Sequence, residues 1–381
     1  MALSTVFLCG PLAHAPLLAA VLGRAVALAP AMLPGHALVW SPARGRVALV
    51  AGGPGVAGAR AAVTAADLAR LDHYAVAAGA APAAVALDDG APVRTWRAPP
   101  PADAAPFDPA GWAARHAAVA VAVAADIMAL YGTRPAAALA ARHQMMLVRA
   151  ASRLRAAGPA PATIRRPCAP GDVHLLARRQ PYANFFAVEE YDLRHRRFDG
   201  AMSPAINRAA FISGDAATVL PYDPVRDRVL VIEQFRPGPQ ARGDANPWLL
   251  EPVAGRIDPA ETPEDAARRE AAEEAGLTLG ALIRIAAYYP SPAAKTEFLY
   301  SFVALADLPD DAAGRLGGMA DEHEDIRAHL LPFERLMQVA ATPEGANGPL
   351  ILSAFWLAAN RDRLRAAGAG GELLEFPPGP A

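Results

Sequence analysis

The stretch 255–277, G-R-I-D-P-A-E-T-P-E-D-A-A-R-R-E-A-A-E-E-A-G-L, decides the fold of the second half of this 381-residue chain. Thr262 is a residue type that caps helices, and Pro263 suits the first helical turn. Gly276 suits the position just after a helix ends, where the backbone turns left-handed. The sequence therefore predicts a short helix between Thr262 and Gly276.

Carboxylates crowd the end of this helix. Glu273 and Glu274 lie in its last turn, where the helix dipole already disfavours anions. Glu270 and Glu274 are four residues apart, and such a like-charge pair costs about 0.2–0.5 kcal/mol. Arg269 can pair with Glu273. A divalent cation would turn the crowding into a binding site, because Mg²⁺ prefers hard oxygen ligands. The alternative is a solvated charged face, as in most Glu-rich helices.

The spacing of the fixed positions separates these two interpretations. The pattern is G-x5-E-x7-R-E-x2-E-E-x-G, and a chance match at a given start is rarer than about one in ten million at average residue usage. Its residues are Gly255, Glu261, Arg269, Glu270, Glu273, Glu274 and Gly276. The stretch resembles the box of the Nudix hydrolase superfamily. Members of that superfamily bind Mg²⁺ or Mn²⁺ on this strand-loop-helix unit and hydrolyse diphosphates linked to nucleosides.

Further segments resemble the ADP-ribose pyrophosphatase branch of that superfamily, over roughly residues 171–366. They are 194–203, 220–236, 247–255 and 321–327. The resemblance implies hydrolysis of ADP-ribose to AMP and ribose 5-phosphate, with two or three Mg²⁺ ions per site and Mn²⁺ as a substitute. It also implies a homodimer, because the family builds its site across two chains that exchange an N-terminal strand.

The resemblance also assigns roles to the acidic residues. The metal ligands that it implies are the backbone carbonyl of Ala254 and the side chains of Glu270, Glu274 and Glu324. The catalytic residues are Glu322, Glu273 and Arg269. Glu322 is the expected general base, but related enzymes differ in this loop, so the division of roles within residues 321–325 stays open.

Substrate contacts follow from local chemistry and from the same resemblance. Residues 229–234 read as a buried strand that leads to Arg236, and a guanidinium suits a diphosphate because it donates two hydrogen bonds and keeps its charge. A surface ion pair is the alternative. The other implied contacts are Phe185 and Phe186 for the adenine ring, Arg208 from across the dimer, Ser291 and Glu297. Ala209, Ser213 and Ala293 depart from the family pattern, which leaves the sugar specificity open.

The first half resembles a different family. Segments 7–12 and 68–74, with Gly58, are similar to the γ-glutamylcyclotransferase-like fold. Ala75 stands where that family has its catalytic glutamate, so no local carboxylate can move the amine proton, and we expect no cyclotransferase activity. The arrangement of such a domain before a Nudix domain resembles the tellurite-resistance-linked Nudix proteins of bacteria.

These observations predict an α+β protein of three parts. Residues 1–105 would form the cyclotransferase-like mixed β-barrel/α domain, 106–158 a helical hairpin connector, and 171–381 a Nudix α/β/α sandwich. The Pro-rich run 159–170 marks the boundary. Other expected strands are 4–9 and 46–51. Other expected helices are 15–22, 65–74, 108–130, 135–156 and one near 350–366.

Composition limits the remaining possibilities. The formal net charge is −2 and the pI about 6.5, so no basic surface favours nucleic acid or anionic membranes. Only two cysteines occur, Cys9 and Cys168, which fits a reducing cytosol and offers no thiolate metal site. Pro, His and Arg interrupt residues 1–39, so neither a signal peptide nor a membrane helix is expected there. The expected location is the cytoplasm.

Three competing interpretations remain. Residues 53–58 satisfy the dinucleotide pattern G-x-G-x-x-G, but 61–64 reads as a strand where that pattern needs a helix, so a nucleotide fold is disfavoured. The enzyme could instead hydrolyse another nucleoside diphosphate sugar or a dinucleotide. A non-catalytic ADP-ribose sensor is the third alternative, and it is disfavoured because the box keeps every carboxylate.

Overall fold

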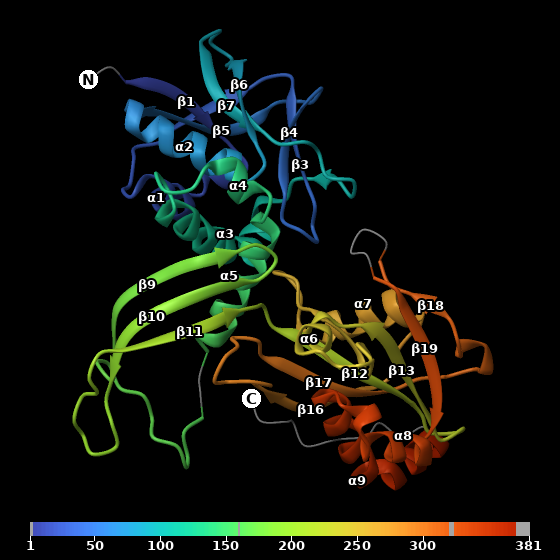
Figure 1. Cartoon of the computed structure of the whole chain (residues 1–381). Coiled ribbons are helices and arrows are strands. Elements are labelled where there is room, and N and C mark those ends of the chain that lie inside the picture. Colours follow the sequence, from blue (N-terminus) through green and yellow to red (C-terminus); the bar gives the residue numbers. More distant parts are fainter. Residues whose placement is uncertain (1–2, 159–160, 320–323, 371–381) are drawn as a thin grey trace. The chain divides into compact units, whose positions relative to one another are not determined.

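The computed structural model describes residues 3–158, 161–319 and 324–370 of a mixed α+β protein, the class that the sequence predicts (Figure 1). The chain divides into two compact units. The first comprises Met1–Cys168, Ala183–Phe186 and Asp258–Ala260. The second comprises Ala169–Tyr182, Ala187–Ile257 and Glu261–Ala381.

A five-stranded sheet runs through the first unit in the order β2-β5-β1-β7-β6. Its strands are β1 (Ser4–Leu8), β2 (Ala29–Leu33), β5 (Val56–Val63), β6 (Ala81–Ala86) and β7 (Pro92–Arg97). β1 pairs antiparallel with β5 and parallel with β7. Successive side chains of a strand point to opposite faces, so Val6 and Leu8 join one apolar core and Phe7 joins another. Residues 53–58 lead into β5, not into a helix, which confirms that the dinucleotide pattern is accidental.

A smaller sheet and five helices complete the described part of the first unit. The sheet has the order β4-β3-β8, with β3 (His36–Trp40), β4 (Val47–Ala51) and β8 (Ala105–Pro106). The helices are α1 (Ala15–Leu22), α2 (Ala65–Ala77), α3 (Pro109–Ala129), α4 (Ala136–Ala140) and α5 (His143–Ala156), with a 3-10 turn at Gly10–Ala13.

The expected helices of the first unit are present with two differences. α2 runs three residues beyond the predicted end at Tyr74. The predicted helix 135–156 is two helices, because Arg142 leaves the helical conformation (φ −124°, ψ 13°) and α5 starts anew after it. α3 is long and apolar enough to cross a membrane by length and composition, but a single helix of this kind is weak evidence, since buried helices of soluble proteins pass the same test.

The second unit begins with a three-stranded antiparallel sheet in the order β11-β10-β9. Its strands are β9 (Val173–Ala183), β10 (Ala187–His195) and β11 (Ile206–Ile212). β9 carries apolar side chains that stay exposed within this chain. They are Val173, Leu175, Leu176 and Tyr182, each more than half exposed.

The larger sheet of the second unit has the order β16-β17-β12-β13-β19-β18, with β14 added to β13 and β15 added to β12. The strands are β12 (Ala216–Asp223), β13 (Arg228–Phe235), β14 (Trp248–Glu251), β15 (Val253–Arg256), β16 (Leu282–Tyr288), β17 (Leu299–Leu305), β18 (Leu316–Gly317) and β19 (Ile326–Pro332). The helices are α6 (Pro237–Arg242), α7 (Pro263–Ala275), α8 (Phe333–Ala340) and α9 (Gly348–Gly370), with 3-10 turns at Asp310–Ala312 and Pro343–Gly345.

Helices cover both faces of this sheet. Leu230 and Ile232 of β13 pack in one core with the alanines of α7, whereas Val229 and Val231 pack in a second core with α8 and α9. All four side chains are fully buried, and each such burial is worth about 1.5–3 kcal/mol. β13 is therefore the buried strand predicted over residues 229–234. In Figure 1, α7 lies on one side of the sheet and α8 and α9 on the other.

Candidate functional site

The helix α7 begins and ends where its sequence predicts. The Thr262 hydroxyl accepts a hydrogen bond from the Asp265 N–H (3.1 Å), and the Asp265 carboxylate accepts one in return from the Thr262 N–H (3.4 Å). This is a capping box, which fixes the first turn. Gly276 follows the last turn with φ +63°, a conformation that costs glycine little. The two ends hold Glu270, Glu273 and Glu274 on a fixed turn.

Arg269 joins three of the acidic side chains. Its guanidinium donates to both carboxylate oxygens of Glu261, at 2.7 and 2.9 Å. It also donates to Glu270 (2.7 Å). The bond to Glu273 (2.9 Å) is the one that the sequence predicts. A further bond reaches the Arg256 carbonyl (2.9 Å). Burial would lower the pKa of Arg269, but Glu261 and Glu270 together raise it well above its ordinary value.

Gly255 is needed because Glu270 occupies the space beside it. A Cβ added at Gly255 would lie 1.8 Å from Glu270 Oε1, far inside any allowed contact. The glycine φ is not positive, so the requirement is for space and not for backbone freedom. Only a glycine at position 255 leaves room for the Glu270 carboxylate to lie against β15.

Glu274 is a buried carboxylate, with only 2% of its surface exposed. It accepts a hydrogen bond from the Ala254 N–H (3.0 Å). The pKa of Glu274 is raised to about 9, mainly by burial and also by Glu270 and Glu324, while the Ala254 bond and Arg236 oppose the shift. Burial likewise raises the pKa of Glu270 to about 7, against the opposing effect of Arg269. These carboxylates favour a proton or another cation, and hard oxygens suit Mg²⁺.

Glu324 lies within electrostatic reach of Glu270 and Glu274 and raises the pKa of both. Its carboxylate accepts a long hydrogen bond from the Met319 N–H (3.3 Å). A Cβ on Gly317 would lie 1.9 Å from the Glu274 carbonyl oxygen, so β18 needs a glycine to approach the end of α7. Glu322, the expected general base, lies outside the described residues.

The acidic groups interact but do not converge on one point. Among the residues that the structure describes, no three Asp, Glu, His or Cys side chains lie close enough together to hold a metal ion by themselves. Ala254 is expected to contribute a backbone carbonyl, which is not a side-chain ligand. The donor set nevertheless fits a divalent ion, because two raised pKa values and an all-oxygen environment occur at the same helix end.

Arg236 forms an ion pair that the sequence did not predict in detail. Its guanidinium donates to Glu251 through Nε (2.9 and 3.1 Å) and Nη2 (2.5 Å). Burial would lower the pKa of Arg236, but Glu251, Glu274 and Glu324 raise it overall. Glu251 is 4% exposed and is therefore a buried anchor. Arg236 therefore forms an ion pair, the alternative to a free guanidinium, with the buried Glu251. In this position it still interacts electrostatically with Glu274 and Glu324.

The other expected substrate contacts belong to other elements than the box. Phe185 and Phe186 belong to the first unit, where their rings meet edge to face with centroids 4.9 Å apart. Arg208 lies on β11 and donates to the Asn207 carbonyl (2.8 Å). Ser291 opens the loop before β17, and its carbonyl accepts from the Lys295 N–H (2.9 Å). Glu297, on the same loop, pairs with Lys295 at 3.6 Å.

Comparisons with known proteins concern the second half of the chain. The sequence model of the NUDIX domain matches residues 213–351. The chain is 38% identical over 194 residues to the ADP-ribose pyrophosphatase of Escherichia coli strain K12, covering 51% of this chain and 91% of that protein. It is 32% identical over 196 residues to the ADP-ribose pyrophosphatase of Haemophilus influenzae, covering 51% of this chain and 89% of that protein.

Two other likenesses are more distant. The GDP-mannose pyrophosphatase of Salmonella paratyphi B is 31% identical over 171 residues, covering 44% of this chain and 86% of that protein. A crystal structure of an ADP compounds hydrolase aligns with 51% of this chain and 98% of its own, with 22% identity and a TM-score of 0.39. At that TM-score the structural likeness carries no weight for function.

Proposed function

This chain belongs to the Nudix family, and on that premise we propose that it hydrolyses ADP-ribose to AMP and ribose 5-phosphate. The observation that supports the proposal is the acidic end of α7, where Glu270 lies against Gly255 and raises the pKa of the buried Glu274. The ADP-ribose pyrophosphatases of two bacteria match the chain along about nine-tenths of their own length. The hydrolase would be residues 171–381.

The proposed cofactor is Mg²⁺, with Mn²⁺ as a substitute and two or three ions per site. The Ala254 carbonyl, Glu270, Glu274 and Glu324 would hold them. When bound, such ions neutralise charge on a diphosphate and lower the pKa of the attacking water. Arg269 would keep Glu270 and Glu273 in place through its bonds of 2.7 and 2.9 Å. Glu322 would accept the proton from the water.

Arg236 would bind the diphosphate. Its bidentate bond to Glu251 fixes the orientation of the guanidinium, so less conformational freedom is lost when substrate binds. The further proposed contacts are Arg208, Phe185, Phe186, Ser291 and Glu297. Arg208 would act from a second copy of the chain, and the phenylalanine pair would stack on the adenine ring.

We propose a homodimer for this reason and for one of surface chemistry. β9 exposes Val173, Leu175 and Leu176, each more than half accessible, along one strand. Adjacent exposed apolar side chains are typical of an association surface. A second copy would cover them and supply its share of the substrate contacts.

For the N-terminal part we propose a γ-glutamylcyclotransferase-like domain (1–105) followed by a helical connector (106–158), as in the tellurite-resistance-linked Nudix proteins. Ala75 offers no carboxylate for the cyclisation, so this domain would lack cyclotransferase activity. Release of 5-oxoproline from γ-glutamyl substrates would contradict this. The proposed location of the protein is the cytoplasm.

A second candidate function is hydrolysis of another nucleoside diphosphate sugar. It is favoured by the likeness to a GDP-mannose pyrophosphatase and by Ala209, Ser213 and Ala293, which depart from the pattern of ADP-ribose pyrophosphatases. The chemistry at the metal would be the same, and only the sugar and base contacts would differ.

A substrate panel with Mg²⁺ separates the two candidates. We expect AMP release from ADP-ribose to exceed nucleotide release from NADH, GDP-mannose and ADP-glucose, measured as kcat/KM. A higher kcat/KM with GDP-mannose would favour the second candidate. Binding of ADP-ribose without turnover of any substrate would favour a sensor and contradict both.

A further inference from the structure

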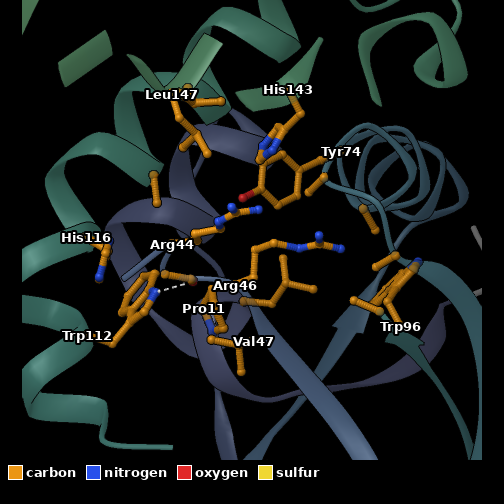
Figure 2. A pocket seen from close by; sticks show the side chains of 18 of the residues that line it. Pro11, Arg44, Arg46, Val47, Tyr74, Trp96, Trp112, His116, His143 and Leu147 are labelled. Atoms are coloured by element: carbon orange, nitrogen blue, oxygen red, sulfur yellow. Dashed lines mark hydrogen bonds between the residues drawn. The ribbon is translucent and has the colours of Figure 1, made fainter. Parts of the chain in front are cut away.

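A cavity of about 140 Å³ lies within the first unit, and Ala75 is part of its wall (Figure 2). Its apolar wall includes Tyr74, Trp96, Trp112 and Leu147. An engineered protein cavity of roughly 150 Å³ holds benzene, so this cavity has room for a group about the size of a six-membered ring.

Two cations line the cavity and no anion does. Arg44 and Arg46 lie on its wall, and in Figure 2 both guanidinium groups reach into the space. Within the part of the chain that the structure describes, neither guanidinium has an ion pair or a side-chain hydrogen bond. None of the lining residues is Asp or Glu. Several other arginines of the described residues pair with a carboxylate, for example Arg24, Arg60 and Arg94, whereas these two leave room for an anion from outside.

The turn that carries the arginines is held rigidly. The Ser41 N–H donates to the Arg46 carbonyl (2.9 Å), and the Gly45 N–H donates to the Ser41 carbonyl (2.8 Å). The Trp112 indole N–H donates to the Gly45 carbonyl (3.1 Å; Figure 2). His116 Nε2 lies 3.1 Å from the Pro42 carbonyl. The turn is therefore fixed from both sides before any ligand arrives, which lowers the entropic cost of binding.

Gly45 shows how closely the turn is fitted. It has φ +67°, and a Cβ there would lie 2.6 Å from His116 Nδ1. Any other residue would displace the imidazole and the turn with it. The sequence A-R-G-R at 43–46 thus places two guanidinium groups on either side of an obligatory glycine.

The remaining polar groups of the cavity are neutral near pH 7. Burial raises the pKa of the Tyr74 hydroxyl, which points into the cavity and stays a hydrogen-bond donor (Figure 2). Burial, together with Arg46, lowers the pKa of His143 to about 4. Burial raises the pKa of the Cys9 thiol to about 12. The two arginines therefore set the charge of the cavity.

We propose that this cavity binds a small organic anion. Its carboxylate or phosphate would meet Arg44 and Arg46 at the mouth, and an apolar body of about ring size would lie beside Tyr74 and Trp96. The lining lacks the carboxylate that proton transfer in a cyclisation would need, so the site binds its ligand and does not convert it. This assigns a ligand-binding role to the N-terminal unit, separate from hydrolysis in the second unit.

The test uses three fluorinated probes of one size and ¹⁹F NMR titration of the full chain. They are 4-fluorobenzoate, 4-fluorophenyl phosphate and the neutral 4-fluorobenzamide. We expect one or both anions to saturate the protein with a Kd about 10-fold below that of the amide, which is the effect of one hydrogen bond to a charged group. The tighter of the two anions identifies the preferred acid. Equal binding of the amide, or no binding of either anion, would overturn the proposal.

Variants locate the binding. Arg46→Gln and Arg44→Gln should each weaken the better anion about 10-fold and leave the amide unchanged. Arg134→Gln is the matched control, because Arg134 is exposed in the same unit and does not line the cavity. Equal weakening by the control would contradict the site. Thermal unfolding shows whether each variant is folded. If one of the two arginine variants does not fold, the other one still tests the site.

One further measurement keeps this proposal independent of the proposed function. Anion binding should persist unchanged in the Glu274→Gln chain, whose hydrolysis is expected to be lost. Loss of anion binding there would place the probe in the hydrolase site and contradict the cavity.

Discussion

The two units differ in the sign of the charge that gathers at each proposed site. In the second unit Glu270 and Glu274 repel each other at the end of α7, and their pKa values rise to about 7 and about 9. In the first unit Arg44 and Arg46 border a cavity that has no acidic wall. Each excess of charge favours a ligand of the opposite sign: a cation in the second unit and an anion in the first.

The two sites also differ in how far their charged side chains are exposed to water. Glu274 is 2% exposed, whereas both arginines are exposed residues of the cavity wall. Water screens the arginines and hardly reaches the glutamate. Changes to the acidic site should consequently have the larger effects, and the following predictions begin there.

The largest expected effect is that of Glu274→Gln. We expect kcat/KM for ADP-ribose to fall by more than about 100-fold, because even residues that only support a metal ligand cost about 10–100-fold. The fold should be unharmed, since Gln has the shape of the protonated acid and a pKa of about 9 means that Glu274 is protonated at neutral pH without metal. Steady-state kinetics with thermal unfolding would check both points.

Glu264→Gln is the matched control for that variant. Glu264 lies on the same helix, in its first turn, and pairs with Arg284 at 2.8 Å. We expect activity to stay within about 2-fold, because exposed ion pairs are worth about 0–1 kcal/mol. If Glu274→Gln kept the activity of the control, the acidic cluster would not be a metal site and the comparison between the units would fail.

The next effect is that of Gly255→Ala. The new methyl group would overlap the Glu270 carboxylate, which is the end of a flexible side chain and can move away. We expect a folded protein whose activity falls by up to about 100-fold, since a displacement of about 1 Å can cost that much. Mg²⁺ titration by calorimetry should show weaker binding. Gly348→Ala is the control, because nothing lies within 4 Å of a Cβ there; an equal loss in both variants would contradict the steric explanation.

A smaller effect is expected for Arg236→Gln. KM for ADP-ribose should rise about 10-fold through the loss of one charge-assisted bond to the diphosphate. The free energy of unfolding should fall by about 1–3 kcal/mol, because the buried Glu251 loses its partner. The double variant Arg236→Gln/Glu251→Gln separates these effects: stability should return and the high KM should remain. A normal KM in either variant would remove Arg236 from the substrate site.

The smallest expected effect is on stability as pH changes. Glu270 and Glu274 have folded-state pKa values raised from 4.5 to about 7 and about 9. A raised pKa means that the folded state holds the proton more tightly, so this stabilisation is complete below pH 4.5 and is lost as pH rises toward 9. Mg²⁺ should reverse that loss. The gain in Tm on adding Mg²⁺ should grow by a few degrees between pH 5 and pH 8; a gain that is constant or falls would contradict the assignment.

The sequence predicts local features of the site and misses distant ones. Thr262, Pro263 and Gly276 define the ends of α7 because capping depends on neighbouring residues. The bond from Arg269 to Glu273 was predictable from their spacing of four. Glu251 was not identified as the partner of Arg236, because they meet only when β13 pairs with β14. The sequence gives no direct sign of such pairing at this separation.

The first unit was harder to predict for the same reason. Its cavity gathers residues between Cys9 and Leu147 together with Pro259, and no short motif connects them. The break between α4 and α5 was also missed, because alanine-rich sequence favours an unbroken helix and only Arg142 departs from it. The dinucleotide pattern at 53–58 was rejected correctly, since the strand that follows it is a local property.

The two cysteines have a practical consequence. Cys9 lies in the cavity wall, and its pKa of about 12 leaves almost no thiolate at neutral pH, while Cys168 is exposed where the first unit ends. Thiolate is the form that reacts with maleimides and iodoacetamides. A single dye should therefore attach at Cys168 without any substitution, at the junction of the two units. Its fluorescence would report whether binding of Mg²⁺ or of the anion changes the surroundings of Cys168.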